Sequence, residues 1–404
     1  MDLDSGYPFW AVKNGLMDPF PPLAGDLRCE VLVIGAGITG ALIADTLHER
    51  GHEVCVLDAR DVGWGSTAAS TALLQYEIDT HMIDLAKRYG EADAVLAYRA
   101  CLEAIDWIGQ RARSVRDVDF ADMHSLYFAS GRKDAKALRE EFDLRERHGF
   151  PVEWLKAPAV CERFCIDAPG AILSRRAARI DPYRMAHRLL QRLRKRGVPI
   201  HDHTVVSRIQ AHARGVDVET TQGFIVRAKH LVMATGYATQ SFIPEDVATN
   251  RSSYAYVTEP IDPTLLGPLR ETMVWESARP YLYLRATGDH RLVVGGEDDA
   301  IDIPAKRDAK VDAKARKLAK RMAKLFPHID ATPSFAWAGT FAETKDGLPW
   351  IGTHPAHGPR VHFAMAYGGN GITYSAIGAE IIAAAIKKRR QPLAELFGFG
   401  RLSR

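Results

Sequence analysis

The stretch "VIGAGITG", Val33 to Gly40, decides the fold of this chain. It links an apolar run, "EVLVIG", to "ALIADTLHERG", which has the pattern of a helix. Gly35, Gly37 and Gly40 have the spacing G-x-G-x-x-G, in which the glycines allow a tight turn, backbone approach to a pyrophosphate and close helix packing. A second apolar run, "EVCVLD", ends at Asp58, where a carboxylate can accept hydrogen bonds from ribose hydroxyls. We therefore predict a strand–helix–strand unit that binds a dinucleotide at the helix N-terminus.

Composition limits the possible functions. The chain has 404 residues, enough for two domains that share a site, and its formal net charge of +3 gives no reason to expect nucleic-acid binding. Five cysteines form an odd and sparse set, which favours a reducing compartment. No signal peptide and no run of eighteen apolar residues is found, so we expect a cytoplasmic protein without a membrane span.

The rest of the chain mixes helical and strand patterns. Amphipathic helices are expected at residues 93–113, 181–197 and 311–326, the second with Asp181 as N-cap and Pro182 at its first position. Short alternating strands follow residue 205, and residues 281–299 have the pattern of an antiparallel hairpin.

The residues after the second strand help to identify the dinucleotide. "GWGSTAASTALLQ", Gly63 to Gln75, offers hydroxyls and backbone amides without bulk, which suits contact along an extended prosthetic group and favours FAD over NAD. Because only one G-x-G-x-x-G occurs, a separate NAD(P)H-binding fold is not expected, and electrons should come from the substrate. A second glycine-dense stretch that opens a helix, "AYGGNGITYSA", lies at Ala366 to Ala376. From the residues alone, its role could be structural or functional.

Taken in order, "VIGAGITG", "VCVLDAR", "GWGSTAASTA", "HLVMATGY", "FAETKDGLPWIG" and "AYGGNGITYSA" resemble the D-amino-acid-oxidase-like (DAO) FAD oxidoreductases, in the glycine oxidase and sarcosine oxidase branch. The resemblance spans Cys29 to Ala385. It implies an α/β, discontinuous Rossmann-like FAD-binding domain (residues 1–92, 158–242 and 336–404) and an α+β substrate domain with an antiparallel sheet (93–157 and 243–335).

The resemblance also implies that the late glycine loop lies against the flavin ring, while the early loop holds its pyrophosphate. Backbone amides of the late loop and the helix N-terminus after it would stabilise the negative charge of a reduced ring. The cofactor contacts expected from the motifs and the resemblance are Gly35, Gly37, Ile38, Thr39, Gly40, Asp58, Ala59, Arg60, Ser66, Thr67, Ser70, Thr71, Ala72, Leu73, Val205, Thr235, Gly236, Gly339, Gly368, Gly369, Asn370, Gly371, Ile372 and Thr373.

Three positions depart from the carboxylate-binding pattern of the family. Phe341 and Gly369 stand where glycine oxidase has arginines, and Gln75 stands where sarcosine oxidase has its carboxylate-binding arginine. Losing such a contact forfeits a charge-assisted bond of roughly 1.5–3 kcal/mol. A simple amino acid is therefore a doubtful substrate unless Arg285, on the predicted hairpin, binds the carboxylate.

Acidic side chains suggest a different substrate. Glu77, Glu297 and Glu343 lie near the matched segments and would suit a cationic amine or polyamine, although most glutamates are simply exposed. Tyr281 and Tyr283 alternate with Arg285 and are expected either to line the pocket or to pack in the interior. We assign the substrate site to Gln75, Arg285, Phe341 and Glu343 and expect no metal.

The family chemistry is oxidation of a C–N bond by hydride transfer to flavin N5, followed by hydrolysis of the imine. Because Gly339 or a neighbour replaces the cysteine that bonds the flavin in sarcosine oxidase, we expect non-covalent FAD. Val293 matches a lysine that assists reaction with oxygen, so oxygen or another acceptor remains open. Two alternatives remain: a flavin-binding subunit of a larger complex without turnover of its own, and, less favoured, a NAD-dependent dehydrogenase. The sequence does not indicate the oligomeric state.

Overall fold

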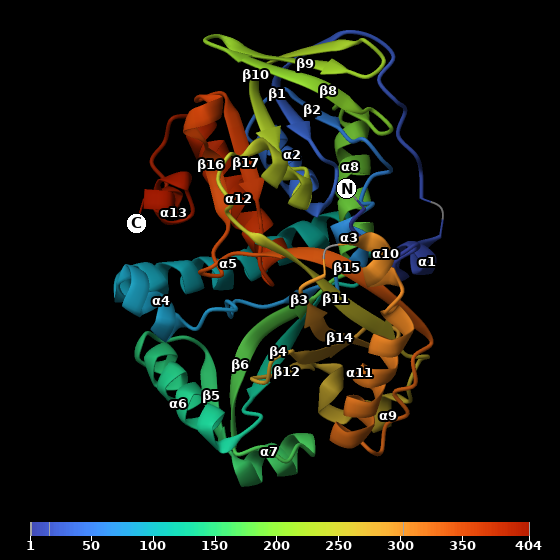
Figure 1. Cartoon of the computed structure of the whole chain (residues 1–404), viewed down its shortest axis with the longest axis vertical. Helices are drawn as coiled ribbons and strands as arrows, with labels where there is room; N and C mark the ends of the chain where they lie inside the picture. The colour runs from blue at the N-terminus through green and yellow to red at the C-terminus, as the bar shows by residue number, and fades with distance from the viewer. Residues whose placement is uncertain (1, 16, 302, 404) are drawn as a thin grey trace.

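The computed structural model describes residues 2–15, 17–301 and 303–403. Two large sheets lie one above the other in the view of Figure 1, and the long helix α5 (Glu91–Val115) runs between them. The upper, eight-stranded sheet has the order β16-β17-β10-β1-β2-β7, with the β8–β9 hairpin joined to β10. The lower, nine-stranded sheet has the order β15-β11-β14-β13-β12-β4-β6-β3, with β5 paired to β6.

The upper sheet is built around the strand–helix–strand unit predicted from the glycine motif. β1 (Leu27–Ile34) pairs in parallel with β2 (Val54–Leu57), and α2 (Ile38–Glu49) connects them. Alternation along β1 places Val31 and Val33 against the helices, while Leu32 and Ile34 face a second core beside the β8–β9 hairpin. The other elements of this half are α8 (Pro182–Lys195), β7 (Ile200–His201), β8 (Val206–His212), β9 (Gly215–Thr220), β10 (Ile225–Met233), β16 (Trp350–Thr353), β17 (Val361–Met365), α12 (Gly371–Ile386) and α13 (Leu393–Leu396).

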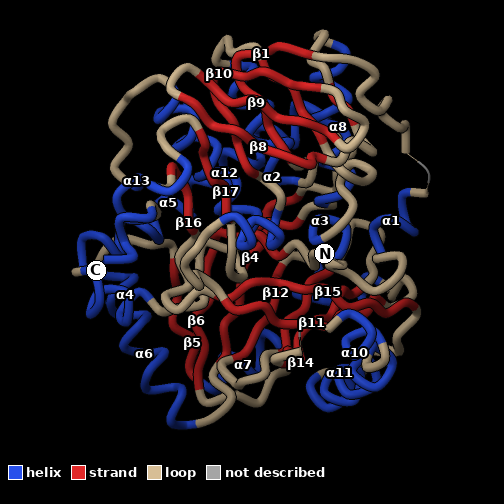
Figure 2. Tube along the Cα trace, turned by 45° about the horizontal axis from the view of Figure 1, so that its top comes forward, coloured by secondary structure: helices blue, strands red, loops and turns tan. Residues whose placement is uncertain are grey.

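The lower sheet is mostly antiparallel, and helices cover its outer side (Figure 2). Its strands are β3 (Leu73–Leu74), β4 (Ala121–Phe128), β5 (Val152–Lys156), β6 (Gly170–Arg179), β11 (Thr249–Val257), β12 (Thr272–Glu276), β13 (Leu282–Ala286), β14 (Leu292–Asp299) and β15 (Phe335–Glu343). The remaining helices are α1 (Phe9–Asn14), α3 (Ser66–Ala69), α4 (Met82–Tyr89), α6 (Arg132–Arg147), α7 (Ala157–Phe164), α9 (Pro263–Leu266), α10 (Pro304–Asp308) and α11 (Val311–Leu325).

The predicted fold class and the principal predicted elements are confirmed. The three predicted helices are α5, α8 and α11, and Asp181 caps α8 by accepting a hydrogen bond from the Arg184 amide at 2.9 Å. The predicted hairpin is formed by β13 and β14, whose register pairs Leu284 with Val294. Within the part of the chain that the structure describes, no helix has the length and apolar character needed to cross a membrane.

The domain boundaries remain a prediction, but several elements lie with the half that these boundaries did not assign to them, among them α5, β6, β3 and β15. α5, in the range given to the substrate domain, contributes Ala97, Cys101 and Ile105 to the core beneath the upper sheet. β6, in the range given to the FAD-binding domain, pairs with β4 in the lower sheet. None of these assignments could be made from periodicity, because an amphipathic helix or a strand gives no sign of which of two neighbouring sheets it joins.

Candidate active site

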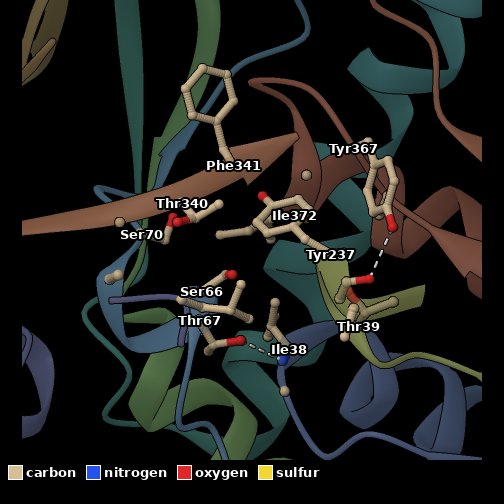
Figure 3. A pocket seen from close by; sticks show the side chains of 18 of the residues that line it. Ile38, Thr39, Ser66, Thr67, Ser70, Tyr237, Thr340, Phe341, Tyr367 and Ile372 are labelled. Carbon is tan, nitrogen blue, oxygen red and sulfur yellow. Dashed lines mark hydrogen bonds between the residues drawn. The ribbon is translucent and has the colours of Figure 1, made fainter. Parts of the chain in front are cut away.

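A cavity of about 850 Å³ lies between the two sheets. The G-x-G-x-x-G loop and the 66–75 segment form one wall, and the loop before α12 forms another. Strands β11 to β15 of the lower sheet line one side of the cavity, and residues 204–209 and 233–238 of the upper half also contribute to the lining. Figure 3 shows several of these side chains converging on the open space. The two glycine-dense stretches, more than three hundred residues apart, therefore open into one cavity.

The early glycine loop leaves room for a ligand at the start of α2. Gly35 has φ of +109°, and a Cβ there would lie 2.2 Å from the Ala234 carbonyl oxygen. A Cβ on Gly37, which faces the cavity, would lie 2.9 Å from Thr67 Oγ1. That hydroxyl accepts a hydrogen bond from the Ile38 amide at 2.9 Å (Figure 3). The first turn of α2 thus presents backbone amides at an anion-binding helix end.

Asp58, which follows β2, binds the backbone of this loop. Its two carboxylate oxygens accept hydrogen bonds from the Ala36 amide at 2.6 Å and the Arg60 amide at 2.9 Å. Burial raises the pKa of Asp58, whereas these two amides and the nearby Arg60 side chain oppose the rise. Asp58 and Arg60 both line the cavity, which is the arrangement expected where a dinucleotide's ribose and phosphates are held.

The late glycine loop forms a second helix N-terminus on the same cavity. Gly368, with φ of +90°, donates its amide to the Ala342 carbonyl at 2.8 Å. Asn370 Nδ2 donates to the carbonyls of Gln75 and Glu77, at 3.1 and 2.9 Å. The first-turn amides of α12 have no helical carbonyl to bind and stand at the cavity wall.

The two helices that begin at the cavity are joined to each other. Thr39 Oγ1 on α2 and Ser375 Oγ on α12 lie 2.7 Å apart in a hydrogen bond. Their starts are therefore held together, and the two positive dipole ends address one ligand.

The structure brings together nearly all residues expected to contact the cofactor. Every one of them lines the cavity except Gly40. Gly40 instead lies behind the loop, where a Cβ would come 1.7 Å from the Gly35 carbonyl oxygen. Its role is therefore close packing of α2 on β1, as the third glycine of the motif requires, and not contact with the ligand. The cofactor contacts themselves remain predictions.

Aromatic side chains from the lower sheet wall the other end of the cavity. Trp275 stacks on Tyr127 with ring centroids 3.6 Å apart, and its Nε1 donates to Ser125 Oγ at 3.0 Å. Tyr283 lies across β14 because Gly295 has no side chain there; a Cβ would lie 2.4 Å from the Tyr283 ring. Trp275, Tyr281 and Tyr283 all face the cavity. Of the two expectations for the tyrosines, the structure therefore supports that they line the pocket.

Of the four residues assigned to the substrate site, Gln75, Phe341 and Glu343 line the cavity, but Arg285 does not. The Arg285 side chain is fully buried and donates to the carbonyls of Thr71 at 2.8 Å and Ile180 at 3.0 Å. Its proposed role as a carboxylate anchor is therefore wrong. The guanidinium donors of Arg285 are occupied by backbone carbonyls. Arg285 therefore holds the Thr71 segment in position without reaching the cavity.

The three glutamates considered for a cationic substrate have different positions. Glu343 lines the cavity but forms an ion pair with Arg251 at 2.7 Å. The carboxylate of Glu77 is buried, accepts a hydrogen bond from Ser174 and lies 3.9 Å from Arg145. Glu297 does not line the cavity: it pairs with Lys317 at 2.6 Å and Arg321 at 2.9 Å. Glu297 therefore lies outside the candidate site and does not face a substrate there.

Four charged residues of the cavity wall were not predicted from the sequence: Asp79, Arg208, Arg279 and Asp298. Asp79 and Arg279 stand outside any strand, where no periodicity indicates direction. Asp298 stands beside Glu297 and takes the inward position that alternation would have given to its neighbour. A possible signal was the acidic run "GGEDD", whose two glycines indicate a break in regular pairing.

The N-terminal segment closes the cavity from the side. Leu3 lines the cavity, and Asp4 forms a bridge to Gly339 of β15. Trp10 is fully buried, and its Nε1 donates to the Ser70 carbonyl at 2.7 Å. The aromatic-rich start of the chain thus covers the segment expected to lie along the cofactor.

Changing Trp10 to phenylalanine is expected to lower the free energy of unfolding by about 1–3 kcal/mol, because the part-buried Ser70 carbonyl loses its donor. Thermal unfolding of the holoprotein and the rate of flavin loss would measure the effect. Phe335→Leu, a change at a neighbouring aromatic residue that makes no such bond, serves as the control. An unchanged Trp10→Phe protein would show that the bond does not hold the segment.

The fold and this cavity together define a flavin-dependent oxidoreductase. The model of the family described as FAD dependent oxidoreductase (DAO) matches residues 30–385, and the chain belongs to that family. Gamma-glutamylputrescine oxidoreductase of Escherichia coli is 25% identical over 389 residues, covering 94% of this chain and 88% of that protein. Glycine oxidase of Geobacillus kaustophilus is 25% identical over 372 residues, covering 90% and 94%. The crystal structure of L-proline dehydrogenase from P. horikoshii has a similar fold, with a TM-score of 0.78 at 18% identity, covering 94% and 98%.

The cofactor is FAD, and the cavity fits it without a covalent bond. A cradle for a dinucleotide is formed by two helix N-termini, by a glycine turn in which a Cβ would clash, and by the Asp58 carboxylate. All five cysteines lie within the described residues, and none lines the cavity. Residues 35–39 and 58–60 would hold the dinucleotide part, and residues 368–373 would hold the edge of the ring.

Proposed function

We propose that this chain oxidises the C–N bond of an amine or amino acid. The bound flavin supplies a hydride acceptor, and the imine formed from the substrate is then hydrolysed. The observation that carries the proposal is the aromatic chamber of Trp275, Tyr281 and Tyr283, which shares one cavity with the late glycine loop. Relatives named for oxidation of glycine and of gamma-glutamylputrescine support the same reaction class.

The chamber's side chains are suited to orientation and exclusion of water. Stacking on Tyr127 and the bond to Ser125 fix the Trp275 ring. Burial raises the pKa of Tyr283 to about 12, so its hydroxyl stays protonated and can donate a hydrogen bond to a substrate. Such a chamber contributes to rate by holding the reacting carbon in position and by removing water from it.

The proposal is tested by mixing the yellow holoprotein, without oxygen, with panels of amino acids and of amines that lack a carboxylate. Loss of the oxidised flavin's visible absorbance with at least one compound is the expected result. Re-admission of air then distinguishes an oxidase, which recovers its colour, from a dehydrogenase that needs another acceptor. If dithionite bleaches the flavin but no amine or amino acid does, the alternative of a flavin-binding subunit without its own turnover would be favoured.

A further inference from the structure

Resting on the proposed function, we propose that Asp79 and Asp298 form a cation-binding pair, so that the substrate is an amine selected by its ammonium group and not by a carboxylate. The two carboxylates belong to different segments, one following β3 and one at the end of β14, and both line the cavity.

A bulge turns Asp298 into the cavity. The register between β11 and β14 shifts between Ser252 and Tyr254, so that residues 297 and 298 both face Ser253. Glu297 has φ of +56° at this point, and its side chain points to the lysine and arginine partners on α11. Asp298 takes the inward direction as a result.

Asp298 carries an unused acceptor. Its Oδ1 is buried and has no hydrogen-bond partner among the described residues. A buried carboxylate oxygen without a partner carries a large desolvation cost, which a bound donor would offset. A ligand that donates a hydrogen bond would therefore supply the partner that Asp298 Oδ1 lacks in the described part of the chain.

Asp79 sets the second carboxylate beside the late glycine loop. Its Oδ2 accepts a hydrogen bond from the Gly369 amide at 2.9 Å. A Cβ at position 369 would lie 2.8 Å from this carboxylate, so glycine is needed for the approach. The family resemblance places an arginine of glycine oxidase at position 369. In this chain the Asp79 carboxylate lies beside that position instead.

No ion pair among the described residues joins a cation of the protein to either aspartate, although Arg279 lies close enough to oppose the rise that burial causes in the pKa of both. Arg251 is engaged by Glu343 at 2.7 Å. Arg279 is exposed and lies over the Tyr281 ring at 3.7 Å. The aromatic faces of Trp275 and the two tyrosines add cation–π attraction for an ammonium group in the same chamber.

Two ligands of the same shape and opposite charge test the inference on the oxidised holoenzyme. tert-Butylammonium has no hydrogen on the carbon next to nitrogen, so it binds without being oxidised, and pivalate is its anionic counterpart. Calorimetric titration is expected to show binding of tert-butylammonium and none of pivalate. Asp298→Asn and Asp79→Asn should each weaken the ammonium about tenfold or more, since each removes one charged acceptor.

The control is Glu297→Gln, which removes a charge from the adjacent residue of the same bulge without facing the cavity; its affinity for tert-butylammonium should be unchanged. Binding of pivalate that Arg279→Gln abolishes would overturn the inference and make this an anion site. So would unchanged affinity in both aspartate variants. Ammonium binding that depends on the aspartates, with no substrate found to bleach the flavin, would uphold the pair while the proposed oxidation failed.

The pH dependence gives a second readout on the same titration. Burial raises the pKa of Asp298 to about 6; Asp79 and Glu343 add to the rise, while Ser253 and Arg279 oppose it. An alkylammonium stays charged throughout this range. Affinity should therefore increase as the pH rises through about 6 and Asp298 ionises, and this increase should disappear in Asp298→Asn. The groups that face Asp298 are Asp79, Ser253, Arg279, Tyr281, Tyr283 and Glu343.

Discussion

Replacing Gly40 with alanine is expected to give a protein that no longer retains FAD. The added Cβ would lie 1.7 Å from the Gly35 carbonyl oxygen and 2.8 Å from its carbon, and both are backbone atoms of the loop. Relief requires moving α2 away from β1 or distorting the turn that presents the helix amides. We expect a cost above about 3 kcal/mol, beyond ordinary overpacking of a core.

The measurement is the ratio of flavin to protein after purification, with circular dichroism as a check on the fold. Gly378→Ala is the matched control, since it also places a methyl group on a buried helix of this half. There the nearest atom is the Ile351 Cδ1 methyl at 3.1 Å, which a rotation can move aside. A Gly40→Ala protein that carries FAD as fully as Gly378→Ala would contradict this account of the third glycine.

The sequence was informative wherever backbone geometry demanded a residue type. A tight turn between a buried strand and a helix admits only glycine at positions such as Gly35, so the motif predicted the cavity wall correctly. The role of the late loop came from the family resemblance, because its glycines alone left that role open; in the structure Gly368 has a positive φ and Gly369 makes room for a carboxylate.

Side-chain direction was predictable only on regular strands. Alternation placed Tyr281 and Tyr283 on one face with Arg285, and the two tyrosines do line the cavity. Arg285 does not, because its long side chain turns toward the carbonyls of Thr71 and Ile180. At the bulge in β14 the alternation reverses, so that Asp298, and not Glu297, lines the cavity.

Charged residues in irregular segments could not be placed at all. Asp79 follows a strand of two residues, and Arg279 lies between β12 and β13. Their neighbours in space come from other parts of the chain, such as the Gly369 amide that binds Asp79. The charge of the substrate end therefore depends on tertiary contacts that no local pattern records.

A buried charge cluster supports the segment that carries Asp79. The side chains of Arg145, Glu141 and Glu77 are all fully buried. Arg145 Nε donates to Glu141 Oε1 at 2.8 Å, and the Glu141 carboxylate accepts the amides of Met82 and Ile83 at the start of α4. The cluster thus holds both ends of residues 77–83, next to the cavity.

Changing Arg145 to methionine is expected to lower the free energy of unfolding by about 3–5 kcal/mol, because it leaves two carboxylates buried without their cation. FAD should also dissociate faster, since the Glu77 carbonyl accepts the Asn370 side chain of the late loop at 2.9 Å. Urea unfolding followed by intrinsic fluorescence and by release of flavin would measure both effects. Arg139→Met is the matched control on the same helix: its pair with Asp143 is exposed and is worth at most about 1 kcal/mol.

The pH dependence of this loss separates a charge effect from a packing effect. Burial alone would raise the pKa of Glu141, but Arg145 and the two amides hold it below its usual range. In the native protein its stabilising contribution is therefore present above the unfolded pKa, about 4.3, and is lost as the pH falls below it. Without Arg145, burial should raise the pKa of Glu141, and the folded state would take up a proton that the unfolded state does not hold. The deficit of Arg145→Met should then be smaller at pH 5 than at pH 8, whereas a deficit independent of pH would mean that lost packing, and not unpaired charge, weakens the variant.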